Sequence, residues 1–273
     1  MDIEALFSNL HTLPSIPKVA QDLIQQFDSP TSSLDGVARN IALDPVIAAK
    51  VLRLANSARF RGARESTSIE DAAMRLGFNT LRTLVMASAV TGAFKASPNF
   101  DLKGFWLHSF QVASISRLLA KQKGVDPDTA FTCGMMHDIG ELLIQTGAPE
   151  FAEKLNSGKG GATGRAASET LQLGFGYPEV GAELARRWQL PAVIQQAIAY
   201  QARPMQAPAD ALLPRILAQA VLVSEALQAH GGATEEARQS LEGPLVEGVD
   251  LDALFAALPA VLEADKAFAE LLT

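Results

Sequence analysis

Apolar residues recur along this chain at the spacing of an α-helix, from near its first residue to its last. Behind Pro17, the residues Val19, Leu23 and Phe27 follow one another at intervals of four, which places them on one helical face. The same spacing recurs in later segments, at Ile47, Val51 and Leu54, at Val180, Leu184 and Trp188, and at Ile216, Ala220, Val223 and Leu227. No run of alternating β-branched residues is long enough to predict a strand. The pattern predicts an all-α protein.

Capping residues indicate where these helices begin and end. Asp44 and Asp126 are each followed by proline, which combines an N-cap with the residue preferred at the first helical position. Ser68 begins a loose capping box, with aspartate in place of glutamate three residues later. Gly77 and Gly124 suit the position just after a helix. These signals predict short loops between the helices.

The polar stretch at residues 95–104, KASPNFDLKG, is the clearest internal boundary. We expect an N-terminal bundle of five helices over residues 1–95 and a second helical bundle over 96–230. Residues 231–273 would form a loop and a C-terminal helical tail. We expect the three parts to make up one folding unit.

The composition limits the classes of partner. The chain has 273 residues, of which 48% are hydrophobic, and this is enough apolar material for a substantial core. The net charge of −7 argues against nucleic-acid binding, which needs a basic face to displace counterions. Two short basic clusters are expected to lie on solvated faces. The first consists of Arg59, Arg61 and Arg64, and the second of Arg186 and Arg187.

The sequence predicts a cytoplasmic location. The N-terminus lacks the basic region followed by an apolar one that is typical of a signal sequence. We expect no apolar run to approach the roughly 18 residues that span a bilayer. Membrane attachment is therefore not expected. The single cysteine, Cys133, lies in an apolar run and is expected to be a buried thiol in a reducing compartment.

The candidate chemistry centres on His137 and Asp138, in the segment GMMHDIGELL, and on His108 in an earlier apolar helix. Imidazole and carboxylate groups are ordinary ligands of a hydrolytic metal. We expect one helix to run through Phe131, Met135, His137 and Leu142, in which neighbouring side chains point about 100° apart and share no face. The spacing leaves two readings open. Other helices could complete a metal site, or the imidazole could donate to a backbone carbonyl while the carboxylate pairs with a nearby donor.

Five segments in order resemble the HDOD family, whose name stands for HD-related output domain. They are LPSIPKVAQDLIQQFDSPTSSLDGVARNIALDPVIAAKVLRLANSARF (13–60), SIEDAAMRLGFNTLRTLVMAS (68–88), FWLHSF (105–110), AFTCGMMHDIGELLI (130–144) and EVGAELARRWQLP (179–191). The resemblance covers about residues 10–230. It implies an N-terminal helical bundle packed against a bundle like that of the HD phosphohydrolases, with a C-terminal helix.

The resemblance also implies a metal-ligand set. In catalytic members of the HD superfamily, several histidines, a His-Asp doublet and a late aspartate surround one or more metals. His108 matches the first histidine, and His137 with Asp138 matches the doublet. Glu225 falls near the late acidic position and is a candidate fourth ligand.

This chain departs from the catalytic pattern at three positions. Tyr177 stands where a histidine is expected, and Tyr200 with Gln201 stands where a pair of histidines is common. Neither tyrosine nor glutamine is a common replacement for histidine on a divalent hydrolytic metal. A two-metal site is therefore not expected. One Fe, Mn, Ni or Zn ion could still be held, because three protein ligands suffice for a catalytic zinc. Otherwise no cofactor is expected.

The resemblance implies a non-catalytic regulatory or adaptor protein in bacterial signal transduction. It would bind a signalling protein or a nucleotide-like small ligand. The alternative is a metal-dependent phosphohydrolase with a reduced site, in which His108, His137 and Asp138 hold the metal. The histidines missing at Tyr177, Tyr200 and Gln201 favour the first reading.

Overall fold

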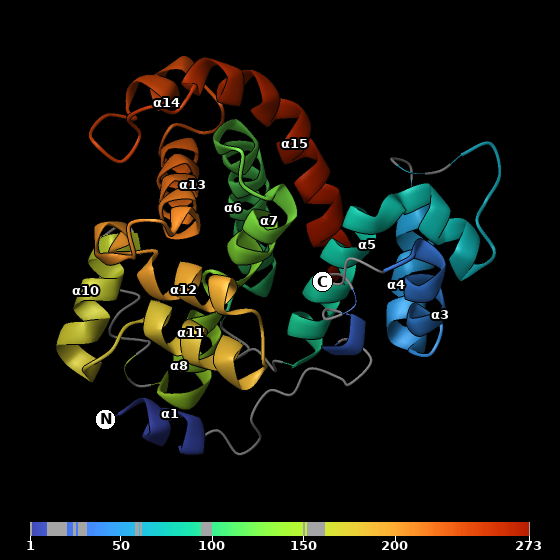
Figure 1. The fold of residues 1–273 in the computed structure, drawn as a ribbon, viewed down its shortest axis with the longest axis horizontal. Coiled ribbons are helices and arrows are strands. Elements are labelled where there is room, and N and C mark those ends of the chain that lie inside the picture. The colour runs from blue at the N-terminus through green and yellow to red at the C-terminus, as the bar shows by residue number, and fades with distance from the viewer. Residues whose placement is uncertain are drawn as a thin grey trace. The chain divides into compact units, whose positions relative to one another are not determined.

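The computed structural model describes residues 2–9, 21–23, 26, 32–57, 60, 62–93, 100–149, 151 and 162–272. All regular elements within these ranges are helices, so the predicted all-α class is confirmed. The helices are α1 (Ile3–Asn9), α3 (Leu34–Ile41), α4 (Pro45–Ala55), α5 (Ile69–Ala93), α6 (Leu102–Lys123), α7 (Pro127–Met136), α8 (Ile139–Gly147), α10 (Ala162–Leu173), α11 (Tyr177–Arg187), α12 (Ala192–Tyr200), the 3-10 helix η1 (Pro204–Gln206), α13 (Leu212–Ala229), α14 (Glu235–Gln239) and α15 (Leu251–Leu272) (Figure 1).

The chain divides into two compact units. One contains α3, α4 and α5, and the other contains α1 together with the elements from α6 to α14. The predicted ranges 1–95, 96–230 and 231–273 stay predictions. Pro17, Val19 and Phe27 of the first expected helix lie outside the described residues, as do Arg59 and Arg61.

The predicted helix ends follow from local hydrogen bonds and backbone conformation. The side chains of Asp44 and Asp126 each accept a hydrogen bond from a backbone N–H in the first turn that follows. Gly124 ends α6 with a left-handed φ of 66°. Gly77 interrupts α5 with a φ of 75°, and a second helical stretch follows it directly.

The second unit is built around α6, which packs against α7 and α13 (Figure 1). Trp106 and Phe110 of α6 are fully buried. Gly134 lets α7 approach closely, because a Cβ there would lie 2.4 Å from the Cα of Ala113. Beside this group, α11 packs against α8 and α12. Cys133 is buried and forms no disulfide, as expected.

One helix corrects an expectation about membranes. The sequence was expected to hold no apolar run near the length of a membrane span, yet the 18 residues of α13 have a mean hydropathy of 1.2 and meet that test. In the fold, 61% of this stretch is buried. Its partners are α6, α7 and α12, so α13 serves as a core helix of the second unit.

Candidate metal centre

The three ligand candidates from the sequence come together in the second unit. One possible ligand atom from each of His108, His137 and Asp138 lies within 4.8 Å of the others. The ring centroids of the two histidines are 5.2 Å apart. His108 comes from α6, and the other two residues connect α7 to α8.

The chain reaches this arrangement by breaking a helix. The expected continuous helix from Phe131 to Leu142 is wrong, because α7 ends at Met136 and α8 begins at Ile139. Nδ1 of His137 lies 2.7 Å from the carbonyl oxygen of Gly134, and this contact satisfies a group at the end of α7. Since His137 and Asp138 fall at the break, the rule that adjacent helical residues diverge does not apply to them.

His137 is held as a neutral imidazole. Burial, followed by the neighbouring His108, lowers the pKa of His137 to about 3. When Nδ1 donates to the Gly134 carbonyl, Nε2 carries a free lone pair, and this is the tautomer that can bind a metal. The backbone carbonyl of His137 accepts a hydrogen bond of 2.7 Å from Nε2 of Gln201.

His108 is supported from α13. Its Nδ1 lies 3.2 Å from the Ser224 hydroxyl and 3.0 Å from Nε2 of Gln228. The amide nitrogen of Gln228 can only donate, so Nδ1 of His108 accepts from it and the proton of the neutral imidazole lies on Nε2. To bind a metal through Nε2, His108 would have to carry its proton on Nδ1, from which the Ser224 hydroxyl can accept a hydrogen bond. Burial lowers the pKa of this histidine below its ordinary value, so the neutral form is favoured.

Asp138 belongs to a cluster of charges that the sequence did not reveal. It is the N-cap of α8 but makes no side-chain cap hydrogen bond. A guanidinium nitrogen of Arg165, on α10, lies 4.0 Å from Oδ2 of Asp138 and 2.6 Å from Oε2 of Glu141. Nε of the same guanidinium lies 2.9 Å from Oε1 of Glu169. Oε2 of Glu169 accepts a hydrogen bond of 2.6 Å from the backbone N–H of Tyr177.

The charges in this cluster perturb one another. Burial, followed by the negative charge of Asp138, raises the pKa of Glu141 to about 7. Burial also raises the pKa of Glu169. Although burial alone would lower the pKa of Arg165, the carboxylates of Asp138 and Glu141 outweigh it and raise that pKa above its ordinary value. The guanidinium is therefore charged at every pH at which the protein folds.

The positions that depart from the catalytic pattern carry contacts of other kinds. Tyr177 is 2% exposed, and its ring centroid lies 5.2 Å from the Arg165 guanidinium carbon. Burial raises the pKa of Tyr177 well above its ordinary value, so it is a neutral phenol. Gln201 is buried and donates to backbone carbonyls, whereas Tyr200 is half-buried. Glu225 lies outside the group of ligand atoms that His108, His137 and Asp138 form, but its charge acts on His108.

Sequence reasoning missed Glu141, Arg165 and Glu169. Two weak signals were present, because Arg165 and Glu169 are four residues apart on one helix and Glu141 lies one turn after Asp138. Neither signal connects α10 with α8. Only the tertiary contact between these helices identifies the cluster.

The donor set fits one metal ion. Two neutral imidazoles and a carboxylate are the ligand types of Zn, Fe, Mn and Ni sites, and three protein ligands leave a coordination position open. When bound, such an ion would lower the pKa of a water molecule and polarise a phosphoryl oxygen. His108 and His137 would hold the ion and Asp138 would supply the negative charge, in competition with Arg165.

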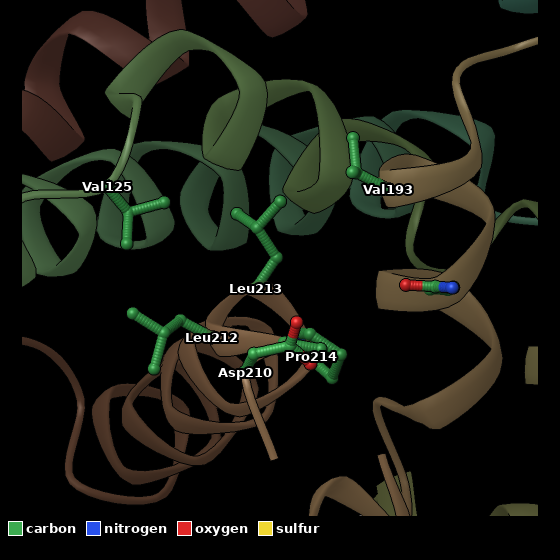
Figure 2. A pocket seen from close by; sticks show the side chains of 8 residues that line it. Val125, Val193, Asp210, Leu212, Leu213 and Pro214 are labelled. Atoms are coloured by element: carbon green, nitrogen blue, oxygen red, sulfur yellow. The ribbon is translucent and has the colours of Figure 1, made fainter. Parts of the chain in front are cut away.

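A separate pocket of about 290 Å³ lies away from these residues. Its lining includes the aliphatic side chains of Val125, Val193, Leu212 and Leu213 (Figure 2). Asp210 also lines it. Since no candidate ligand belongs to this lining, the pocket and the metal centre are distinct sites.

Comparison with known proteins identifies a protein family and several proteins to which this chain is similar. Residues 13–204 match the HDOD domain family. A crystal structure of a protein from Shewanella amazonensis SB2B, named "putative phosphohydrolase", is 34% identical, covers 98% of both chains and gives a TM-score of 0.80.

Two further relatives extend the comparison. An HDOD domain protein of unknown function from Geobacter sulfurreducens has the same fold, with a TM-score of 0.78 at 24% identity over 99% of this chain and 98% of its own. An uncharacterized protein of Treponema pallidum (strain Nichols) is 25% identical over 209 residues, which are 76% of this chain. This chain spans only 40% of the length of that relative.

Proposed function

This chain belongs to the HDOD family, and on that premise we propose that it is a non-catalytic regulatory or adaptor protein of bacterial signal transduction. It acts by binding a signalling protein or a nucleotide-like small ligand, and not by hydrolysing a substrate. We place this action in the cytoplasm, without nucleic acid or membrane as a partner. The buried Cys133, which forms no disulfide, and the net charge of −7 support that placement.

The observation that carries the proposal is the composition of the centre. Hydrolysis by two metals requires ligands for both ions, which together hold the attacking and the leaving oxygens. Here three ligand candidates gather, and Tyr177 beside them is a buried neutral phenol. Gln201 directs its amide nitrogen, which cannot bind a cation, at the carbonyl of His137.

The test is an assay of turnover on purified protein, prepared without a chelator or a metal-affinity step. Bis-p-nitrophenyl phosphate is supplied as substrate with Mn²⁺, Fe²⁺, Ni²⁺ or Zn²⁺ in separate reactions. We expect wild type and Asp138→Asn to give the same rate as buffer with metal alone. A metal-dependent rate in wild type that the Asp138→Asn variant loses would overturn the proposal.

A second candidate function is a metal-dependent phosphohydrolase with one ion. The close approach of His108, His137 and Asp138 favours it, as does the name of the Shewanella relative. Elemental analysis by inductively coupled plasma mass spectrometry separates the two candidates. About one equivalent of Fe, Mn, Ni or Zn, lost in His137→Ala, would support the second candidate. A metal content well below that level would support the first.

A thermal-shift screen with mononucleotides and cyclic dinucleotides tests for a small ligand. A ligand at about 100 times its dissociation constant stabilises the fold by about 2.7 kcal/mol, which is readily measured. The pocket beside Leu212 does not favour nucleotides, because the charge of Asp210 would repel phosphate groups. Stabilisation by a nucleotide would therefore direct attention to the centre around His108, while a flat screen would favour a protein partner.

A further inference from the structure

We propose that the guanidinium of Arg165 is a built-in cation that fills a second cation site formed by Asp138, Glu141 and Glu169, and that it keeps a divalent metal out of that site. This inference goes beyond the regulatory function and does not depend on it. It concerns why the centre can hold at most one metal ion.

The geometry places Arg165 among carboxylates from three parts of the fold. Asp138 comes from the junction of α7 and α8, Glu141 from α8, and Glu169 from the same helix as the arginine. Their oxygens lie 4.0, 2.6 and 2.9 Å from the guanidinium nitrogens. These are oxygen ligands of the type that Mg²⁺ and Mn²⁺ prefer. The arginine therefore lies where a hard cation would otherwise bind.

The carboxyl groups of the cluster are largely shielded from water, although the side chain of Arg165 is 27% exposed. The side chain of Glu169 is 0% exposed, and those of Glu141 and Asp138 are 13% and 12% exposed. A buried charge is strongly destabilising unless it is paired. One guanidinium supplies one positive charge to three carboxyl groups, so the site has room for the second positive charge that a divalent ion carries.

Arg165 is held in this place by groups on both sides. Glu169, which accepts from Nε of the arginine, is itself fixed by the backbone N–H of Tyr177. The ring of Tyr177 lies 5.2 Å from the guanidinium carbon, within range of a cation–π contact. Since guanidinium cannot lose its proton in a protein, it competes with a metal at every pH. Tyr177, at a position where catalytic relatives are expected to carry histidine, thus helps to hold the competing cation.

The experiment compares Mn²⁺ binding by wild type, Arg165→Gln and Arg165→Lys, by equilibrium dialysis and elemental analysis after chelator treatment. We expect Arg165→Gln to bind about one equivalent of Mn²⁺ more than wild type, because the three carboxyl groups lose the cation that lies among them. Arg165→Lys keeps the charge and should bind as wild type does. The double variant Arg165→Gln/Glu169→Gln should lose the additional equivalent.

Arg187→Gln is the matched control, because Arg187 also pairs with two glutamates, Glu183 and Glu4, at 2.7 Å. Glu4 is 71% exposed, so water can solvate its carboxylate when Arg187 is replaced. We therefore expect Arg187→Gln to bind no additional Mn²⁺. A folded Arg165→Gln protein that binds no more Mn²⁺ than wild type would overturn the proposal.

If Arg165→Gln fails to fold in chelator, refolding from urea is followed by circular dichroism with and without Mn²⁺. Mn²⁺ should restore the helical signal of this variant, and failure to do so would also overturn the proposal. These readouts concern metal binding alone. Turnover of bis-p-nitrophenyl phosphate by wild type would contradict the proposed non-catalytic function, but it would leave the proposed role of Arg165 unaffected.

Discussion

At the scale of single residues, His137 is held by hydrogen bonds between side chains and backbone carbonyls. His137 contacts the carbonyl of Gly134, and Gln201 donates to the carbonyl of His137. These contacts satisfy the groups that the break between α7 and α8 would otherwise leave unpaired. The position of His137 therefore depends on residues outside the set of candidate ligands.

Replacement of Gln201 by methionine should lower the free energy of unfolding by roughly 1–3 kcal/mol. The buried carbonyl of His137 would lose its donor, and an unsatisfied buried acceptor carries a desolvation cost of that size. Urea denaturation measures the change. Gln196→Met, on the exposed side of the same helix, is the control and should stay within about 0.5 kcal/mol of wild type. Equal effects of the two substitutions would contradict this account of Gln201.

The neutral state of His137 predicts a pH dependence in the metal-free protein. Its pKa falls from the ordinary 6.5 to about 3 on folding, so between these values the unfolded chain binds more protons than the native one. Stability is therefore lost as the pH falls below 6.5. Glu141, whose pKa is raised to about 7, contributes in the opposite direction. The wild-type curve alone cannot separate the two effects.

Comparison with His137→Gln isolates the histidine, since Glu141 is present in both proteins. The stability advantage of wild type over the variant should shrink by roughly 1 kcal/mol for each pH unit between about pH 6.5 and about pH 5. Urea unfolding in the presence of a chelator at several pH values provides the measurement. An advantage that stays constant over this range would show that His137 is not buried in its neutral form.

At the scale of elements, glycine determines how closely the helices around the centre can approach. A Cβ at Gly140 would lie 2.0 Å from the carbonyl oxygen of Tyr177 and 2.7 Å from the backbone nitrogen of Gly181. Both neighbours are backbone atoms, so α8 and α11 would have to move apart. The close contact brings Tyr177 to the charge cluster next to Asp138.

Gly140→Ala should lower the free energy of unfolding by about 1–3 kcal/mol, the usual cost of overpacking. Gly164→Ala is the control, because a Cβ at this position in α10 meets no atom within 4 Å. That variant should be as stable as wild type or up to about 1 kcal/mol more stable, since alanine favours the helix. Urea midpoints of the two variants give the comparison, and a tolerated Gly140→Ala would show that α8 and α11 are not in close contact.

At the scale of the whole molecule, the start of the chain is attached to helices far along the sequence. α1 packs against α8, and Glu4 accepts hydrogen bonds of 2.7 Å from Arg187, 183 residues away. The guanidinium carbon of Arg187 also lies over the ring of Phe7, 4.1 Å from its centroid. Leu6 is fully buried. The attachment therefore combines an apolar contact with an ion pair.

The free energies expected for the apolar contact of Leu6 and for the ion pair of Glu4 show which of them contributes more to stability. Leu6→Ala should cost roughly 2–5 kcal/mol, because it leaves a cavity in a closed contact. Glu4→Gln should cost under about 1 kcal/mol, because Glu4 is 71% exposed and surface ion pairs are weak. Thermal unfolding measures both, and hydrogen exchange in α1 reports its detachment. A larger loss for Glu4→Gln than for Leu6→Ala would reverse this assignment.

The sequence by itself determined the all-α class, several helix ends and the three ligand candidates. The class and the helix ends rest on local chemistry. Apolar spacing selects the helix, side chains such as Asp44 cap the next turn, and Gly124 adopts a left-handed conformation that other residues avoid. The ligand candidates were identified through resemblance to a family, whose motifs lie in continuous stretches of sequence.

Only the tertiary structure decided how those candidates meet and what surrounds them. The break at His137 and Asp138 could not be read from the sequence, because a helical pattern continues through it and the groups that satisfy it include Gln201, far along the chain. The pairing of Arg165 with Glu141 is equally non-local, since it joins α10 to α8. Burial then fixes the charge states, and burial is a property of the packed molecule and not of any segment within it.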